Sequence, residues 1–200
     1  LATMTMYQGI SFTISGSRSF NKFADGFMTI GQGKIGMVSF PIIIFIIVVI
    51  VFSFIMSKTC FGRFVYAVGG NPEAAHLAGI NVKRTKLIVF AIAGFLFALA
   101  DIILISRGGS ANSTMGPGTE FDGITACVLG GVSFIGGAGK IRGALVGCLI
   151  LGVLSNGMQL AGMGVYAQSI VKGAILIGSI AMDTLQQNAK TKVKKAAAAA

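Results

Sequence analysis

Residues 40–57, FPIIIFIIVVIVFSFIMS, form an apolar run of 18 residues without a charged side chain. A helix needs about 20 mostly apolar residues to cross the hydrocarbon core of a bilayer, so this run predicts a membrane-spanning helix. Pro41 stands in the first turn, where proline is tolerated because its missing N–H has no helical partner there. Charged residues make up only 11% of the chain, whereas a soluble domain contains about 25%. Lipid is therefore the expected solvent for much of the chain.

Further apolar segments predict an all-α fold, a polytopic membrane helical bundle. The abundant glycine, 29 residues, fits this class because small residues let membrane helices approach closely. One apolar segment, at 124–137, is short and interrupted by glycine, and it predicts a glycine-broken membrane helix. Besides 40–57, the predicted spans are approximately residues 1–15, 87–106, 124–137, 143–161 and 166–182.

The distribution of Lys and Arg predicts how the chain is oriented. The loop at 58–86 carries five basic residues against one acid, Glu73, and the tail contributes four more. Basic loops remain on the cytoplasmic side, so we expect this loop and the C-terminal tail, including residues 191–200, in the cytoplasm. An even number of crossings must then separate them, which requires 124–137 to cross the membrane. The alternative is a re-entrant dip at 124–137, which would leave the basic tail outside.

The net charge of +10 has the same explanation. In a soluble protein such a charge indicates binding to nucleic acid. Here the basic residues cluster in loops beside apolar spans, which is the positive-inside pattern. We therefore expect contact with membrane lipid and no nucleic-acid partner.

The loop at 58–86 contains a short segment with the features of a helix. Gly69-Gly70-Asn71-Pro72 predicts a turn, in which Asn71 and Pro72 supply a cap and a first turn. Glu73 follows at the start of the helix, where the dipole favours an acid, and Gly79 is suited to end it. A helix of small residues in a loop between two spans indicates a contact surface for a partner outside the membrane.

A glycine-rich run follows at residues 130–139, GGVSFIGGAG. One interpretation is close helix packing, because glycines let backbones approach each other. The other is a helix broken at membrane depth beside a transport pathway, where freed backbone groups face protein or water. The two are compatible. The residues concerned are Gly130, Gly131, Ser133, Gly136 and Gly137.

Polar side chains within the predicted spans are the other candidates for function. Asp101 and Lys172 lie at similar predicted depths, so we expect them to form an intramembrane pair; Lys172 could instead reach the outer headgroups. Ser155, Asn156 and Gln159 could line a pathway or form hydrogen bonds between helices.

Catalytic and metal-binding motifs are missing from the sequence. Residues 136–140, GGAGK, are not a phosphate loop, because Phe134 replaces its first glycine and Ile141 its Ser or Thr. The single histidine, His76, cannot supply a triad or a histidine metal site. The cysteines have no metal-ligand spacing: Cys60, Cys127 and Cys148. We therefore expect no enzyme, no metal site and no cofactor in this chain.

Three separated runs carry a resemblance to a known family: GRFVYAVGGNPEAAHLAGINVKR, ITACVLGGVSFIGGAGKIRGALVG and YAQSIVKGAILIGSIAMD. In this order they resemble permease subunits of bacterial ABC importers for simple sugars, of the ribose and galactose type, a family similar to the branched-chain amino acid permeases. The resemblance covers about residues 1–190. It implies that these residues are the C-terminal portion of one transmembrane permease domain, because the family has several spans before them.

The resemblance implies a location in the bacterial inner membrane and a set of partners. These are ATP-binding subunits that carry ATP and magnesium, a second permease copy or paralogue, and an extracytoplasmic sugar-binding protein. A short cytoplasmic helix of such permeases docks on the ATPase, and here the match falls on Glu73, Ala74, Ala75 and Gly79. The family more often has a small residue at Asp101 and a carboxylate about one turn later, where this chain has Leu104.

Two other functions remain as alternatives. An ion-coupled secondary transporter would need coupling groups near the midplane and usually an inverted repeat, and the sequence has no convincing repeat. An ABC permease for another small solute, such as nucleosides or autoinducer sugars, would have the same architecture. A membrane assembly protein without transport activity would not explain the helix at 73–79.

Overall fold

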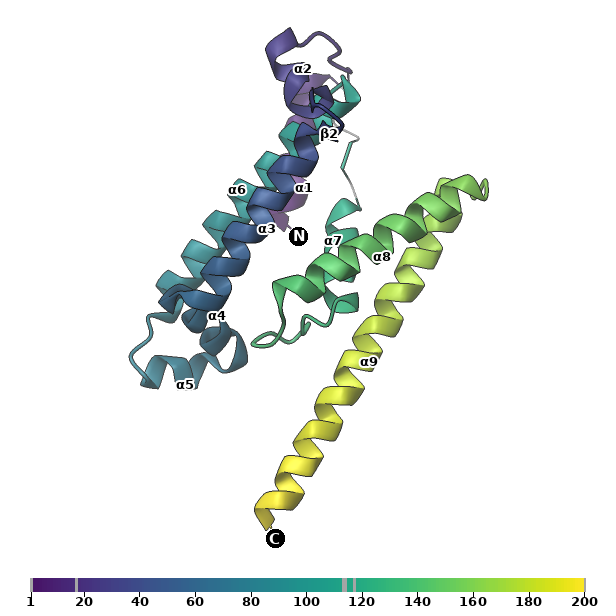
Figure 1. Ribbon diagram of the computed structural model, residues 1–200. Coiled ribbons are helices and arrows are strands. Elements are labelled where there is room, and N and C mark those ends of the chain that lie inside the picture. The colour runs from purple at the N-terminus through teal and green to yellow at the C-terminus, as the bar shows by residue number, and fades with distance from the viewer. Residues whose placement is uncertain (1, 17, 113–114, 117, 200) are drawn as a thin grey trace. The chain divides into compact units, whose positions relative to one another are not determined.

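Helices provide nearly all the regular structure in the computed structural model, which describes residues 2–16, 18–112, 115–116 and 118–199 (Figure 1). The predicted all-α class is thus confirmed. In chain order the elements are α1 (Ala2–Ser15), α2 (Asp25–Gln32), β1 (Lys34–Ile35), β2 (Val38–Ser39), α3 (Phe40–Lys58), α4 (Cys60–Gly70), α5 (Pro72–Leu77), α6 (Val82–Gly108), α7 (Thr119–Leu129), α8 (Ile141–Leu160) and α9 (Val165–Ala199). Two units are distinguished, residues 1–52 with 86–117 and residues 53–85 with 118–200.

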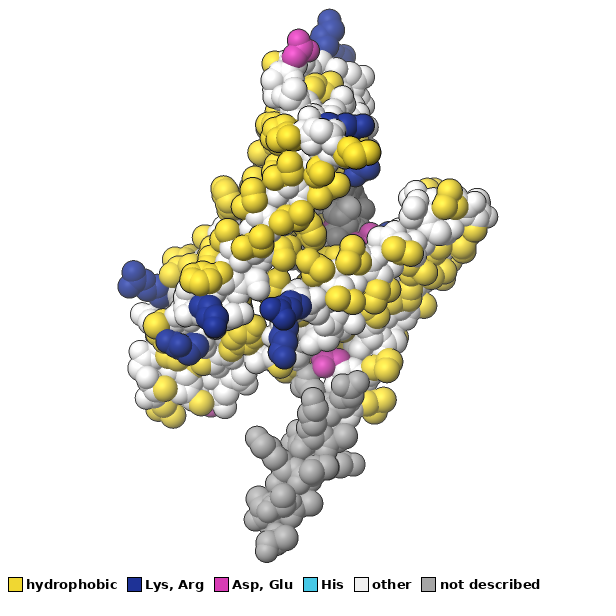
Figure 2. Space-filling model, viewed as in Figure 1, with side chains coloured by type: hydrophobic (Ala, Val, Ile, Leu, Met, Phe, Trp, Pro, Cys, Tyr) yellow, Lys and Arg dark blue, Asp and Glu magenta, His cyan; other side chains and the backbone are white. Residues whose placement is uncertain are grey.

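Among the described residues, four helices are long and apolar enough to cross a membrane: Phe40–Lys58, Val82–Gly108, Ile141–Leu160 and Val165–Leu185. They correspond to the spans predicted at 40–57, 87–106, 143–161 and 166–182. None of the 19 residues of α3, all of them described, is buried, and hydrophobic side chains cover the visible helix surfaces (Figure 2). Apolar side chains that face outward need an apolar solvent, so lipid is the natural environment of these helices.

Two helix boundaries differ by several residues from the prediction: the start of α6 and the end of α9. α6 begins at Val82, before the predicted start, because the Asn81 side chain accepts a hydrogen bond of 3.0 Å from the Arg84 N–H. Such a cap satisfies a backbone donor that the first turn leaves unpaired. α9 continues past the predicted end at 182 and includes most of the basic tail.

The first unit contains a helix and a hairpin between the spans predicted at 1–15 and 40–57. α2 is fastened to α6 through Ser106, which is fully buried. The Ser106 hydroxyl donates to the Phe27 carbonyl and accepts from the Gly31 N–H, both at 2.7 Å. A Cβ atom on Gly31 would overlap with the α6 backbone. The hydroxyl therefore bonds directly to the α2 backbone.

The segment predicted to be a broken span at 124–137 needs a correction. Its helix, α7, starts earlier, at Thr119, and ends at Leu129. Eleven residues extend only about 16 Å at about 1.5 Å per residue, about half the hydrocarbon thickness of a bilayer. Residues 131–140 are not helical. The helix break itself is as predicted, and the crossing of this segment stays a prediction.

Glycines bring α7 and α8 into close contact. A Cβ atom on Gly130 would overlap with the Gly143 carbonyl, and one on Gly147 with the Ala126 carbonyl. Lipid offers little hydrophobic drive for helices to associate, so close packing of this kind carries much of the stability.

Replacement of Gly147 by alanine tests this packing. We expect Gly147→Ala to destabilise the detergent-solubilised protein by about 1–3 kcal/mol, because the added methyl group overpacks the contact. Gly152→Ala, on the same helix with open space around it, is the matched control. It should be neutral or stabilising, since alanine favours a helix over glycine by up to about 1 kcal/mol. The measurement is the thermal midpoint of the monodisperse species; equal effects of the two variants would contradict the packing argument.

Candidate functional site

Helix α5 starts from a strong local signal. The Asn71 side-chain oxygen accepts hydrogen bonds from the backbone N–H groups of Glu73 and Ala74, each at 3.0 Å. Pro72 occupies the first helical position, and Glu73 lies in the first turn, where the helix dipole stabilises a negative charge. The predicted cap is confirmed.

The other end of α5 closes with a Schellman motif. Gly79 has φ of +82°, its N–H donates to the His76 carbonyl, and the Ile80 N–H donates to the Ala75 carbonyl, both at 3.0 Å. Glycine is favoured here because a left-handed conformation strains residues with a Cβ atom. The helix thus ends at Leu77, with Gly79 as the terminating glycine that the sequence predicted. A helix of six residues is not stable alone, so these caps hold its shape.

The four predicted coupling residues divide by exposure. Ala75 is buried and faces the rest of its unit, in which α5 packs against α4. Glu73, Ala74 and Gly79 are exposed. Sequence reasoning missed Leu77, a large apolar side chain that is 88% exposed; its signal was that no other large apolar residue lies in α5.

A broad open groove lies beside α5, with a volume of about 970 Å³. It runs between α5 and the first turn of α6, so it offers a concave surface next to the exposed Leu77. The residues along it are Pro72, Glu73, His76, Leu77, Gly79, Ile80, Asn81, Val82 and Lys83.

The glycine segment, residues 130–140, touches the end of α4 through backbone atoms. A Cβ atom on Gly69 would lie 2.7 Å from the Gly137 nitrogen, and one on Gly136 would lie 2.9 Å from the Gly69 carbonyl oxygen. Both distances are shorter than any real Cβ contact. The Tyr66 hydroxyl adds a hydrogen bond of 3.0 Å to the Gly139 carbonyl. α4, which sequence reasoning did not predict as a helix, therefore joins α5 to the glycine segment.

The predicted glycine cluster thus has several roles. Gly130 packs on α8, whereas Gly136 and Gly137 pack on α4. Ser133 stays within the segment, where its N–H donates to the Ala138 carbonyl at 2.9 Å, and Gly131 takes a left-handed φ of +79°. Close packing, one of the two interpretations, accounts for three of the five residues.

A second contact holds the glycine segment from α9. The Phe134 N–H donates to the Asp183 carboxylate at 3.1 Å. Asp183 follows directly after the last predicted span, and sequence reasoning gave it no role. The segment is therefore fixed by α4 through Tyr66 and by α9 through Asp183.

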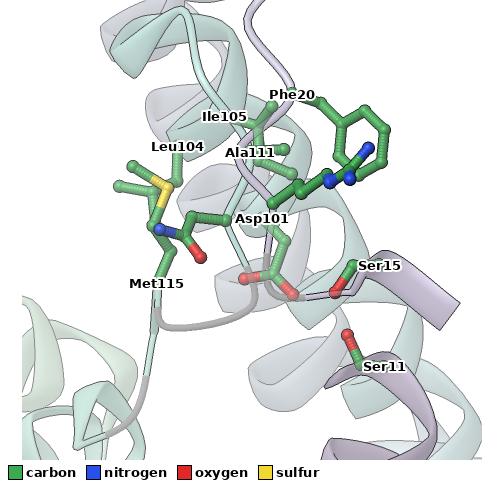
Figure 3. Close-up of a pocket in the computed structure, with 10 residues that line it drawn as sticks. Ser11, Ser15, Phe20, Asp101, Leu104, Ile105, Ala111 and Met115 are labelled. Carbon is green, nitrogen blue, oxygen red and sulfur yellow. The ribbon is translucent and has the colours of Figure 1, made fainter. Parts of the chain in front are cut away.

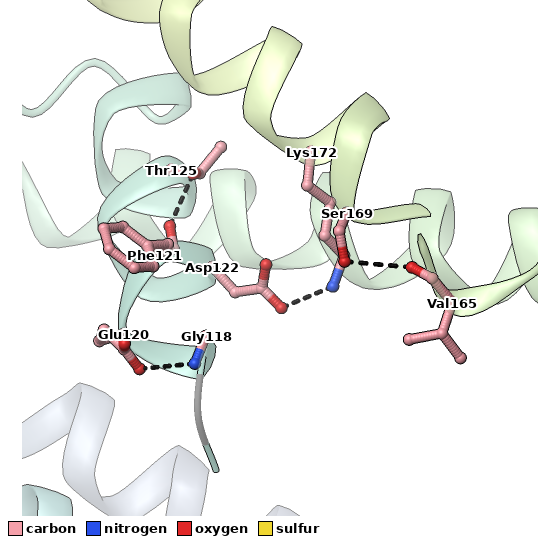
Figure 4. A network of polar contacts seen from close by, with 8 residues as sticks. All are labelled: Gly118, Glu120, Phe121, Asp122, Thr125, Val165, Ser169 and Lys172. Carbon is pink, nitrogen blue, oxygen red and sulfur yellow. Dashed lines mark hydrogen bonds and ion pairs between the residues drawn. The ribbon is translucent and has the colours of Figure 1, made fainter. Parts of the chain in front are cut away.

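Lys172 forms an ion pair with a residue that the sequence did not indicate. Its ammonium lies 2.6 Å from the Asp122 carboxylate in α7 (Figure 4). The expected partner Asp101 belongs to the other unit, so its pairing with Lys172 stays a prediction. Asp122 was missed because it lies before the span predicted at 124–137, whereas the structure places it in the first turn of α7. The buried Thr125 lies about one turn further along α7, and its hydroxyl donates to the Phe121 carbonyl at 2.6 Å.

The remaining polar candidates belong to both units. Asp101 lines a pocket in the first unit (Figure 3). On α8, Ser155 is half-buried, and Asn156 and Gln159 are exposed. A pathway role for these three α8 residues stays a prediction.

The bond between Tyr66 and Gly139 can be tested by hydrogen exchange. We expect Tyr66→Phe to speed exchange of the amides at 132–138 about fivefold, because a hydrogen bond contributes about 1 kcal/mol against local opening. Tyr166→Phe is the matched control, since that side chain is 89% exposed. Unchanged exchange in Tyr66→Phe would show that this bond does not hold the glycine segment.

A double-mutant cycle tests the Lys172–Asp122 pair. The variants Lys172→Met and Asp122→Asn should show a coupling of about 0.2–1 kcal/mol in thermal unfolding, because both groups are partly exposed. Glu120→Gln is the control. Its carboxylate accepts from the Gly118 N–H, so its effect should add to that of Lys172→Met. Strict additivity in the cycle with Asp122 would argue against the pair.

Comparison with known proteins identifies the family of this chain. Residues 1–180 match the family described as the branched-chain amino acid transport system permease component. The chain is 40% identical over 193 residues to the L-arabinose transport system permease protein AraH of Escherichia coli K12, covering 96% of this chain and 59% of that protein. It is 41% identical over 187 residues to the ribose import permease protein RbsC of Haemophilus influenzae, covering 92% and 58%.

A third relative is the xylose transport system permease protein XylH of Haemophilus influenzae, 42% identical over 174 residues, covering 84% of this chain and 46% of that protein. The chain thus spans about half to three fifths of the curated relatives it matches. None of the solved structures matches it. The family match over residues 1–180 and the resemblance of the three sequence runs agree, and the chain belongs to the branched-chain amino acid transport system permease family.

Proposed function

We propose that this chain forms part of the membrane-spanning permease of an ATP-driven importer for simple sugars. The observation that carries the proposal is α5, a capped helix with an exposed apolar side chain, joined through α4 to a glycine segment. Permeases for arabinose, ribose and xylose are among its relatives, which supports a sugar as the cargo.

The exposed face of α5 is suited to receive force from an ATPase subunit. Leu77 offers an apolar anchor of the kind that dominates binding energy when a partner covers it. Glu73 and Ala74 beside it are exposed, and the groove next to α5 gives the partner a concave surface. ATP and magnesium bind on that partner, and this chain is the part that moves.

Movement of α5 passes to the glycine segment through α4. Backbone contacts transmit displacement directly, because no flexible side chain lies between Gly69 and Gly137 to absorb the movement. Gly131, Gly136, Gly137 and Gly139 take left-handed conformations, which glycine enters and leaves at little cost. The segment can therefore switch between two arrangements of similar energy, as alternating access requires.

We further propose an orientation for the chain in the membrane and two more partners. The loop that carries α5 is basic and so faces the cytoplasm of a bacterium, where an ATPase is available. A sugar-binding protein delivers cargo from outside, and a second permease, identical or related, closes the pathway. Selectivity rests mainly with the binding protein.

Leu77→Asp tests the docking surface. We expect sugar uptake by the assembled transporter to fall about tenfold or more, since removal of a leucine from an interface loses about 1.5–3 kcal/mol. Met37→Asp is the matched control, because Met37 is also a highly exposed apolar residue and belongs to the β1–β2 hairpin of the other unit. The measurement is uptake of labelled pentoses at equal permease levels in the membrane.

The energy source separates the proposal from an ion-coupled transporter. Uptake should stop with an ATPase inhibitor such as vanadate and continue when an ionophore removes the proton gradient. Uptake that depends on the proton gradient and is unchanged by Leu77→Asp would contradict the proposal.

A further inference from the structure

A pocket of about 330 Å³ lies in the first unit, bounded by the end of α1, the last turns of α6, and the chain segments that follow each helix (Figure 3). Its volume is at the lower end of the range for small-molecule sites. Six of its lining residues are polar, charged or aromatic: Ser11, Ser15, Arg18, Phe20, Asp101 and Asn112. The function described above assigns no role to this pocket.

The walls of the pocket are fixed by regular structure and by backbone hydrogen bonds. Phe20 and Ala111 exchange two bonds, each N–H donating to the other's carbonyl at 2.9 Å. This pair joins the segment after α1 to the segment after α6. Ser11 and Ser15 are one helical turn apart on α1, so their side chains share a face. The polar groups therefore project from a preformed frame.

Figure 3 shows the Asp101 carboxylate and the hydroxyls of Ser11 and Ser15 turned toward the same space. A carboxylate accepts hydrogen bonds, a guanidinium donates them, and hydroxyl and amide groups do both. With Arg18 and Asn112, the pocket thus offers donors and acceptors together. The formal charges of Arg18 and Asp101 cancel. A neutral ligand that carries several hydroxyl groups matches such a surface.

Phe20 adds an apolar surface at the rim, where its side chain is 56% exposed. A monosaccharide has C–H groups on its ring faces and hydroxyls around its edge, so an aromatic ring and a polar wall suit its two kinds of surface. A carboxylate in an apolar helix is costly, and such groups usually have a function. A hydroxyl-rich ligand gives Asp101 a function, that of accepting hydrogen bonds from the ligand.

We propose that this pocket is a binding site for a monosaccharide inside the permease, with Asp101 as its main hydrogen-bond acceptor. The inference rests on the proposed function, because it takes a sugar as the cargo. Asp101 lies seven residues before the end of α6 at Gly108, about 10 Å along the helix. On the predicted orientation this end is extracytoplasmic, so the pocket lies where a released sugar would enter.

Protection of an introduced cysteine tests the site directly in the full-length permease in membranes. The native Cys60, Cys127 and Cys148 are first replaced by serine, and Ser11→Cys is then labelled with a maleimide. We expect a saturating pentose or hexose from a panel to slow labelling at least fivefold. Thr13→Cys, an exposed position on the same helix outside the pocket, is the matched control and should label at an unchanged rate.

Two substitutions of Asp101 in this background define its role. Asp101→Ala should raise the sugar concentration for half-protection about tenfold, because a hydrogen bond to a charged acceptor is lost. Asp101→Asn keeps an acceptor and should raise it only about threefold. A retained Ser11→Cys labelling rate without sugar checks that both variants fold.

Several outcomes would overturn the inference. These are the absence of protection by every monosaccharide tested, equal protection at Thr13→Cys, or protection by leucine, isoleucine or valine and not by sugars. The last result would instead indicate an amino acid zwitterion held between Arg18 and Asp101.

The protection experiment tests the pocket separately from the proposed function, because labelling needs neither an ATPase nor a binding protein. Protection without ATP-driven uptake would support this site and refute the proposed function. ATP-driven sugar uptake without protection would do the reverse.

Discussion

The contact between the end of α4 and the glycine segment leaves no room for a Cβ atom on Gly69, Gly136 or Gly137. The proposed coupling depends on it, because it joins the capped helix α5 to the connection between α7 and α8. A contact made of backbone atoms is short and stiff, whereas long side chains would absorb displacement through rotamer changes. Tyr66 aligns the contact by its bond to Gly139.

Other contacts in the second unit follow the same physical logic. Helices in lipid gain little from hydrophobic association, so close glycine packing and polar bonds must hold them. Gly130 and Gly147 let α7 approach α8, while Lys172 binds Asp122 and joins α9 to α7. Asp183 adds a bond from α9 to the glycine segment. Each of these contacts meets α7 or the segment that follows it, so that region is the centre of the unit.

Features that depend on neighbours in the chain were predictable. The spans corresponding to α3, α6, α8 and α9 follow from apolar length, and the caps of α5 follow from Asn71 and Gly79. α4 was missed because Gly62, Gly69 and Gly70 are weak helix formers, although Thr59 provides a cap for it. The end of α7 was placed eight residues too late, because the apolar residues of the glycine segment suggest a continuous helix.

The sequence by itself determined the membrane environment, the helical class and the position of the short helix α5, because hydropathy and capping act over a few residues. Only the tertiary structure decided that Asp122 partners Lys172, that Gly69 meets Gly137, and that Asp101 lies in a pocket with Ser11 and Ser15. These pairs are separated by 50 to about 90 positions in the chain. Side-chain type gives no information about which distant residue will be near, since that depends on how whole helices pack.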